Sequence, residues 1–152
     1  MKAELVLAAS AVAVFATPVQ GATVSLSGTV LNSCVLTLPT PGLLVPDAQG
    51  TTLRSDAGVG ARAATLTVAA VGASPSLSFS APQYSGPSGV SVDSVQYAYQ
   101  SAGSGASRGF AATSSTASSH LIDVFTINGK IARADGFPTG SYGMTVDVTC
   151  SQ

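Results

Sequence analysis

Few side chains in this sequence could carry out chemistry, and the first to weigh are His120 and Asp123. They lie close together at the start of a strand-like segment with many serines nearby, so one interpretation is a serine hydrolase. That chemistry needs a nucleophilic serine on a sharp Gly-x-Ser-x-Gly turn, and the sequence contains no such turn. Serines are so frequent here that their closeness to His120 in the sequence indicates nothing. We therefore interpret His120 as a polar surface residue at a loop end, and we expect no enzyme.

The acidic residues give no pattern for a metal either. They never form the Asp-x-Asp-x-Asp-Gly spacing of a calcium loop. We interpret the separate aspartates as solvated loop charges: Asp47, Asp56, Asp93, Asp123, Asp135 and Asp147. Two cysteines and one histidine do not complete a tetrahedral zinc site without an added carboxylate, so the sequence predicts no metal and no cofactor.

The composition argues against a nucleic-acid-binding protein. Charged residues make up 9% of the 152 residues, with 6 Lys and Arg against 7 Asp and Glu. Globular domains usually carry about 25% charged residues. No basic patch for holding phosphates is evident, so nucleic acid is not an expected partner. Serine and threonine alternate with valine, leucine and alanine, which favours β structure over disorder.

The first 21 residues have the layout of a secretory signal peptide. The apolar stretch at residues 5–15 is too short to cross a hydrocarbon core of about 30 Å. Small residues follow it, so we expect cleavage after Gly21 or Ala22. Glu4 is unusual in such a start region, and the alternative is a buried or anchoring N-terminal helix. On the first interpretation, residues 22–152 form one exported β-sandwich domain that reaches the cell surface or the medium through the periplasm.

The expected export has a consequence for the oxidation state of the two cysteines, Cys34 and Cys150. Two cysteines in an oxidising compartment are most simply read as one disulfide. The alternative is two separate buried thiols. Both residues fall on the apolar face of an alternating segment, so a bond between the first and last strands is sterically reasonable.

Alternation of apolar and polar residues predicts the architecture. It is clearest at residues 24–38 and 142–150, and four further segments suggest strands: 64–70, 76–81, 90–99 and 121–132. Glycine and proline separate these segments. Asn128 and Gly129 allow either a tight hairpin turn or a bulge in one longer strand. The Gly/Ser-rich residues 101–119 suggest a mobile surface loop. Tyrosines at alternating positions favour the core over a sugar platform: Tyr84, Tyr97, Tyr99 and Tyr142. These patterns predict an all-β, antiparallel sandwich.

Both ends of the chain resemble a known family. The stretch Ser-Gly-Thr-Val-Leu-Asn-Ser-Cys at residues 27–34 is similar to the first strand of pilin-type subunits of chaperone–usher systems, in particular the spore coat protein U branch. Residues 125–131 and 140–148 resemble the penultimate strand and the Gly-x-Tyr start of the last strand of that branch. One departure concerns Cys34, because the branch usually bonds this cysteine to the next strand, where this chain has none.

The resemblance implies an immunoglobulin-like, pilin-type sandwich that lacks one strand and has an apolar groove between its first and last strands. A neighbour's N-terminal segment would fill this groove by strand addition. The donor residues implied are Val24, Leu26, Gly28 and Val30, and the groove-lining residues are Tyr142, Met144, Val146 and Val148. The implied partners are identical or related subunits, a periplasmic chaperone and an outer-membrane usher, with no small-molecule substrate.

The sequence therefore leads to an exported structural subunit of a fimbria or related surface fibre that supports adhesion or biofilm. The alternative is a self-complete secreted sandwich that binds a glycan or a surface polymer. The two differ in one respect, because only a self-complete sandwich pairs its last strand with its first.

Overall fold

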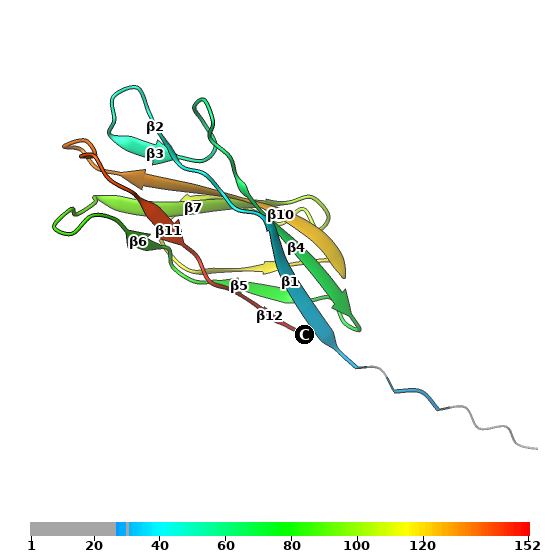
Figure 1. Cartoon of the computed structure of the whole chain (residues 1–152). Coiled ribbons are helices and arrows are strands. Elements are labelled where there is room, and N and C mark those ends of the chain that lie inside the picture. Colours follow the sequence, from blue (N-terminus) through cyan, green and yellow to red (C-terminus); the bar gives the residue numbers. More distant parts are fainter. Residues whose placement is uncertain (1–26, 30) are drawn as a thin grey trace, which may run out of the picture.

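The computed structural model describes residues 27–29 and 31–152, and every regular element in that range is a strand (Figure 1). The strands are β1 (Ser33–Thr40), β2 (Val45–Pro46), β3 (Thr52–Arg54), β4 (Ala64–Val71), β5 (Ser76–Phe79), β6 (Gln83–Ser85), β7 (Ser94–Ser101), β8 (Ser107–Ala111), β9 (Ser115–Ser118), β10 (Ile122–Ala132), β11 (Gly143–Thr145) and β12 (Val148–Ser151). All their pairings are antiparallel. The all-β, antiparallel sandwich predicted from the sequence is confirmed. Over the same residues, no helix has the length and apolar character needed to span a membrane.

The larger sheet is built around β10. One edge of β10 pairs first with β4 and then with β3, while the other edge pairs with β7. Beyond these neighbours, β1 adds to β4, β2 adds to β3 and β8 adds to β7. β10 runs straight through Asn128 and Gly129 with unbroken register against β7, so this pair forms neither a hairpin turn nor a bulge. Gly129 does not have the positive φ that a tight turn of this kind requires.

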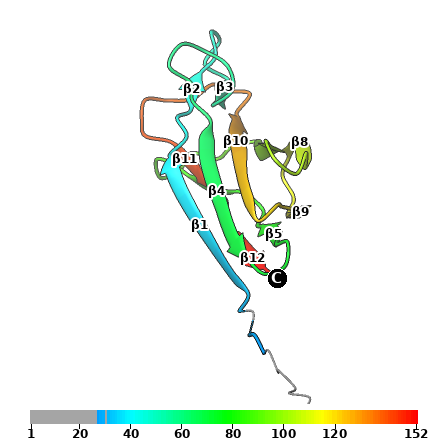
Figure 2. The same ribbon diagram turned by 90° about the vertical axis from the view of Figure 1, so that its right-hand side faces the viewer.

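The second layer consists of two short sheets, one with the order β12-β5-β9 and one that pairs β11 with β6. β11 and β12 follow one another along the chain and run beside β6 and β5 (Figure 1). In Figure 2, β1 and β12 converge at the lower end of the molecule, where the chain terminates.

The core lies between the two layers and is rich in aromatic rings. Phe79 of β5 stacks on Tyr99 of β7 with ring centroids 4.6 Å apart. Tyr97 and Phe125 are fully buried beside them. Alternating positions on β4, β5 and β7 supply most of the remaining core, as the period of two predicted. The interpretation of Tyr97 and Tyr99 as core residues is confirmed.

Residues 101–119, predicted to be a mobile loop, instead contain β8 and β9. β9 pairs with β5, and its Ala117 is buried opposite Leu77. Small residues are needed on this strand because the rings of Phe79 and Tyr99 already fill the space between the layers. The segment therefore lacks the large alternating apolar residues by which a strand is recognised in a sequence.

The interpretation of Asp123 as a solvated loop charge is also wrong. Asp123 is the second residue of β10 and is only 3% exposed. Its side chain points inward because it occupies the same face of β10 as Phe125.

Candidate functional site

The first and last strands are joined by the disulfide between Cys34 of β1 and Cys150 of β12. Their Cα atoms are 6.3 Å apart, and 116 positions separate them along the chain. The predicted disulfide is confirmed, and the alternative of two separate thiols is wrong. A disulfide is consistent with folding in an oxidising compartment. Export itself stays a prediction, because the proposed signal peptide lies outside the described residues.

Beyond the disulfide, the edges of the two layers separate. Within the described residues, β1 pairs only with β4, β12 pairs only with β5, and β11 pairs only with β6. The outer edge of β1 thus faces the outer edges of β11 and β12 with no described strand between them. An unpaired strand edge exposes backbone N–H and C=O groups that can accept another strand.

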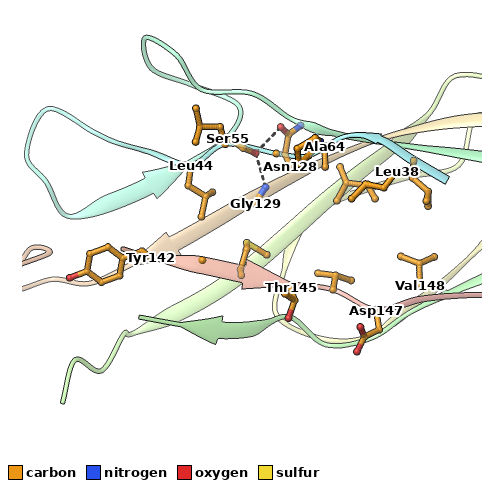
Figure 3. A pocket seen from close by; sticks show the side chains of 18 residues that line it. Leu38, Leu44, Ser55, Ala64, Asn128, Gly129, Tyr142, Thr145, Asp147 and Val148 are labelled. Atoms are coloured by element: carbon orange, nitrogen blue, oxygen red, sulfur yellow. Dashed lines mark hydrogen bonds between the residues drawn. The ribbon is translucent and has the colours of Figure 1, made fainter. Parts of the chain in front are cut away.

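A cavity of about 500 Å³ occupies the space between these edges. Residues 38 and 41–44 line one side, residues 142–148 line the other, and residues 127–129 of β10 contribute to the wall between (Figure 3). Figure 3 shows Leu38 and Val148 at one end of the cavity and Leu44 and Tyr142 at the other. We call this cavity the edge groove.

The edge groove is mainly apolar. Leu66 is buried in its wall, and Ile127 and Met144 are half-buried against the core. Leu38 and Leu43 are 58% and 50% exposed, which is a large area of hydrocarbon in contact with water. Burying such surface is favourable by about 25 cal/mol per Å². An occupant of the edge groove would therefore gain most from apolar side chains.

The polar groups of the wall already bond to one another. Ser55 Oγ donates to Asn128 Oδ1 at 3.0 Å and accepts from the backbone N–H of Gly129 at 2.8 Å. Among the described residues that line the groove, Asp147 is the one that carries a charge, and it is exposed. This chemistry suits recognition of an uncharged extended chain better than it suits catalysis.

A smaller hollow of about 350 Å³ adjoins the end of the edge groove at Leu44 and Tyr142, which line both spaces. Phe137 packs edge-on against Tyr142 with ring centroids 5.0 Å apart. The Tyr142 hydroxyl donates to the backbone oxygen of Pro138 at 2.6 Å. This end of the groove therefore continues into an aromatic hollow, whereas the disulfide lies beyond the other end.

The predicted site residues fall into two groups. All four residues expected to line a groove do line the cavity: Tyr142, Met144, Val146 and Val148. Of the expected donor residues, Gly28 is exposed, and a Cβ there would meet nothing within 4 Å. Val24, Leu26 and Val30 lie outside the described residues. The opposite wall was not predicted, although the apolar pair Leu43-Leu44, directly after Pro41 and Gly42, is a signal for it in the sequence.

A second group of polar side chains surrounds Asp123. Its carboxylate accepts hydrogen bonds from Ser101 Oγ and from the backbone N–H groups of Gly103, Ser104 and Val124. Burial by itself raises the pKa of Asp123, but these hydrogen bonds outweigh it and hold the pKa well below its usual value. Across residues 27–29 and 31–152, no cluster of three or more His, Cys, Asp or Glu side chains could hold a metal ion.

Comparison of this chain with protein-family models, with curated proteins and with solved structures finds no match in any of the three.

Proposed function

We propose that this protein is an exported structural subunit of a fimbria-like surface fibre, which assembles when each subunit receives a strand from its neighbour in the edge groove. The observation that carries the proposal is the apolar cavity between two strand edges that have no partner in the described chain. A strand laid there would pair with a free edge and bury exposed leucines.

The chain itself contains a suitable donor. Residues 22–30 read Ala-Thr-Val-Ser-Leu-Ser-Gly-Thr-Val, with no charge and with apolar residues at alternating positions. In a strand, Val24, Leu26 and Val30 would all point to one side, toward the groove. Gly28 would lie on the same side, where a close approach of two chains leaves no space for a side chain.

The proposal includes helper proteins. An apolar groove between unpaired strand edges promotes aggregation until it is filled. A periplasmic chaperone that covers the groove before assembly, and an outer-membrane usher that exchanges it for a neighbour's donor strand, would meet this requirement. Adhesion or biofilm support would then be a property of the fibre.

The rival proposal, a self-complete secreted module that binds a glycan or surface polymer, expects the last strand to pair with the first. In the described chain β12 pairs with β5, and the disulfide is the link to β1. This arrangement favours the fibre subunit.

The deciding experiment is electrophoresis of the purified exported protein in detergent, with and without boiling. A strand-exchanged fibre gives a ladder of bands in the unboiled sample and a single monomer band after boiling. A monomer band in both samples, at concentrations where the protein is folded, would reject the fibre subunit in favour of the secreted module.

A further inference from the structure

We infer that the Cys34–Cys150 disulfide acts as an end stop for the edge groove, so that the incoming strand is short and enters from the end formed by Leu44 and Tyr142. This inference rests on the function proposed above. The occupant is the segment 22–30 of a second copy of this chain.

The space between β1 and β12 is too narrow for another strand at the disulfide. Neighbouring strands in a sheet lie about 4.8 Å apart, so two strands with a third between them are separated by about 9.6 Å. The Cα atoms of Cys34 and Cys150 are only 6.3 Å apart. A strand therefore cannot lie between β1 and β12 at the disulfide, and the cavity indeed ends at Leu38 and Val148.

The length of the groove limits the length of the strand that it can accept. Residues 142–148 line one side of the groove. At about 3.3 Å per residue, this stretch accepts an extended segment of about seven residues. The segment 22–30 has nine residues, so it fills the groove and leaves a short connection to β1, which begins at Ser33. A longer donor would meet the disulfide.

The disulfide also determines the direction in which the donor strand lies. The donor remains attached at its C-terminal end to the subunit that supplies it, and the disulfide prevents that subunit from lying at the blocked end. The C-terminal end of the donor must then lie at Leu44 and Tyr142, with the N-terminal end against the disulfide. Since β12 runs toward Cys150, the donor lies antiparallel to β12.

The same geometry argues against a chain filling its own groove. Residues 27–29 and 31–32, which precede β1, lie at the disulfide end, where Ser27 and Leu31 are exposed and this described part of the chain extends away from both layers (Figures 1 and 2). To enter its own groove it would have to turn back past the disulfide and lie parallel to β12. The direction of the bound strand therefore distinguishes a neighbour's donor from the chain's own segment.

The test uses the exported chain carrying Leu26→Asp, which cannot bury its own donor, and a synthetic peptide of residues 22–30 joined at its C-terminal end to a small folded domain, which takes the place of the subunit that supplies the donor. A nitroxide label is attached at either end of the peptide, and the broadening of backbone amide signals is measured by NMR. We expect the N-terminal label to broaden Thr149 and the C-terminal label to broaden Gly143. The same peptide with aspartate at the Leu26 position is the matched control and should not bind. The reverse pattern of broadening would overturn the end stop and leave the fibre proposal standing. Absence of binding by either labelled peptide would overturn both.

A second measurement addresses the stop directly. The peptide is extended at its N-terminal end by Val-Thr-Val, and Kd is compared for the disulfide-bonded protein and for its Cys34→Ala/Cys150→Ala variant, both on the Leu26→Asp background. We expect the extension to change Kd less than about twofold with the disulfide present and to tighten it about tenfold without it, because only then can the added valines be buried. An equal gain in both proteins would overturn the inference. If the variant lacks β structure by circular dichroism, the labelled peptides decide the question.

Discussion

Ser101 Oγ lies 2.8 and 2.7 Å from the two carboxylate oxygens of Asp123, inside the sandwich where both residues are buried. Backbone N–H groups of Gly103 and Ser104 donate to the same carboxylate at 2.9 and 3.2 Å. Ser101 ends β7 and Asp123 lies near the start of β10, so the carboxylate holds the β7–β8 turn against β10. Asp123, one of the two residues considered for hydrolase chemistry, thus belongs to a structural network of hydrogen bonds.

Replacing Asp123 by Asn should destabilise the fold, because an amide cannot accept all of these hydrogen bonds and leaves buried donors unsatisfied. We expect Asp123→Asn to lower the free energy of unfolding by about 1–3 kcal/mol in urea titrations at pH 7. Asp135→Asn is the control, since that side chain is 87% exposed. It should change the free energy by less than about 0.5 kcal/mol.

The same carboxylate should make stability depend on pH. The pKa of Asp123 is lower in the folded chain than in the unfolded chain, so the ionised form stabilises the fold. This stabilisation is fully present above the unfolded pKa of about 3.9 and is lost as pH falls below it toward the folded pKa. Wild type should therefore lose stability below about pH 4, and Asp123→Asn should lose less over the same range. Parallel pH profiles for the two proteins would contradict the role of Asp123.

The parts of this structure that were predictable from the sequence are those where a strand has one buried and one exposed face. β4, β5, β10 and the last strands show such alternation of large apolar residues, and both cysteines lie on inward faces of such segments. This alternation therefore predicted the sandwich and made the disulfide sterically reasonable, whereas the groove-lining residues Tyr142, Met144, Val146 and Val148 were implied only by the family resemblance.

The features that could not be predicted from the sequence depend on contacts between segments that are distant along the chain. β9 is a strand because its small residues fit beside Leu77 and Phe79, which no local pattern reveals. Asp123 can be buried because backbone N–H groups of the β7–β8 turn donate hydrogen bonds to its carboxylate. The second wall of the groove comes from residues 41–44, which form a loop with a single bridge from Leu43 to Arg62. A loop position of this kind carries no periodic signal.

Removing the disulfide should weaken the fold. In the chain-entropy description, a crosslink between Cys34 and Cys150 restricts a long loop of the unfolded chain. We expect Cys34→Ala/Cys150→Ala to lower the free energy of unfolding by about 2–5 kcal/mol in urea, with β structure retained at low denaturant. Unchanged stability in the double variant would mean that the crosslink restricts the unfolded chain very little.

Gly129 should control the shape of the edge groove. A Cβ at this position would overlap with Met144 Sδ, on the facing wall. The thioether is near the end of an adaptable side chain, so Met144 can move aside at a cost of about 1 kcal/mol. The groove would then be narrower at its middle, and Gly129→Ala should weaken binding of the peptide 22–30 about tenfold.

The matched control is Gly109→Ala in β8. A Cβ at Gly109 would meet nothing within 4 Å, and the residue is exposed. Both stability and peptide binding should be unchanged within error. Equal effects of the two substitutions on peptide binding, measured by titration calorimetry, would show that Gly129 has no special place in the groove.

The strongest test of assembly lies in the donor segment, where Ser25 and Leu26 are adjacent but would point to opposite sides of a strand. In the proposed fibre, Leu26 would enter the neighbour's apolar groove and Ser25 would face away from it. An aspartate at position 26 would be buried without a partner, at a cost of several kcal/mol. Leu26→Asp should therefore abolish the ladder of unboiled bands and leave the monomer folded by circular dichroism, whereas Ser25→Asp should retain the ladder. If Leu26→Asp instead unfolds the monomer and neither wild type nor Ser25→Asp forms a ladder, the segment belongs to the chain's own sandwich. The protein would then be a secreted binding module whose first strand completes its own fold.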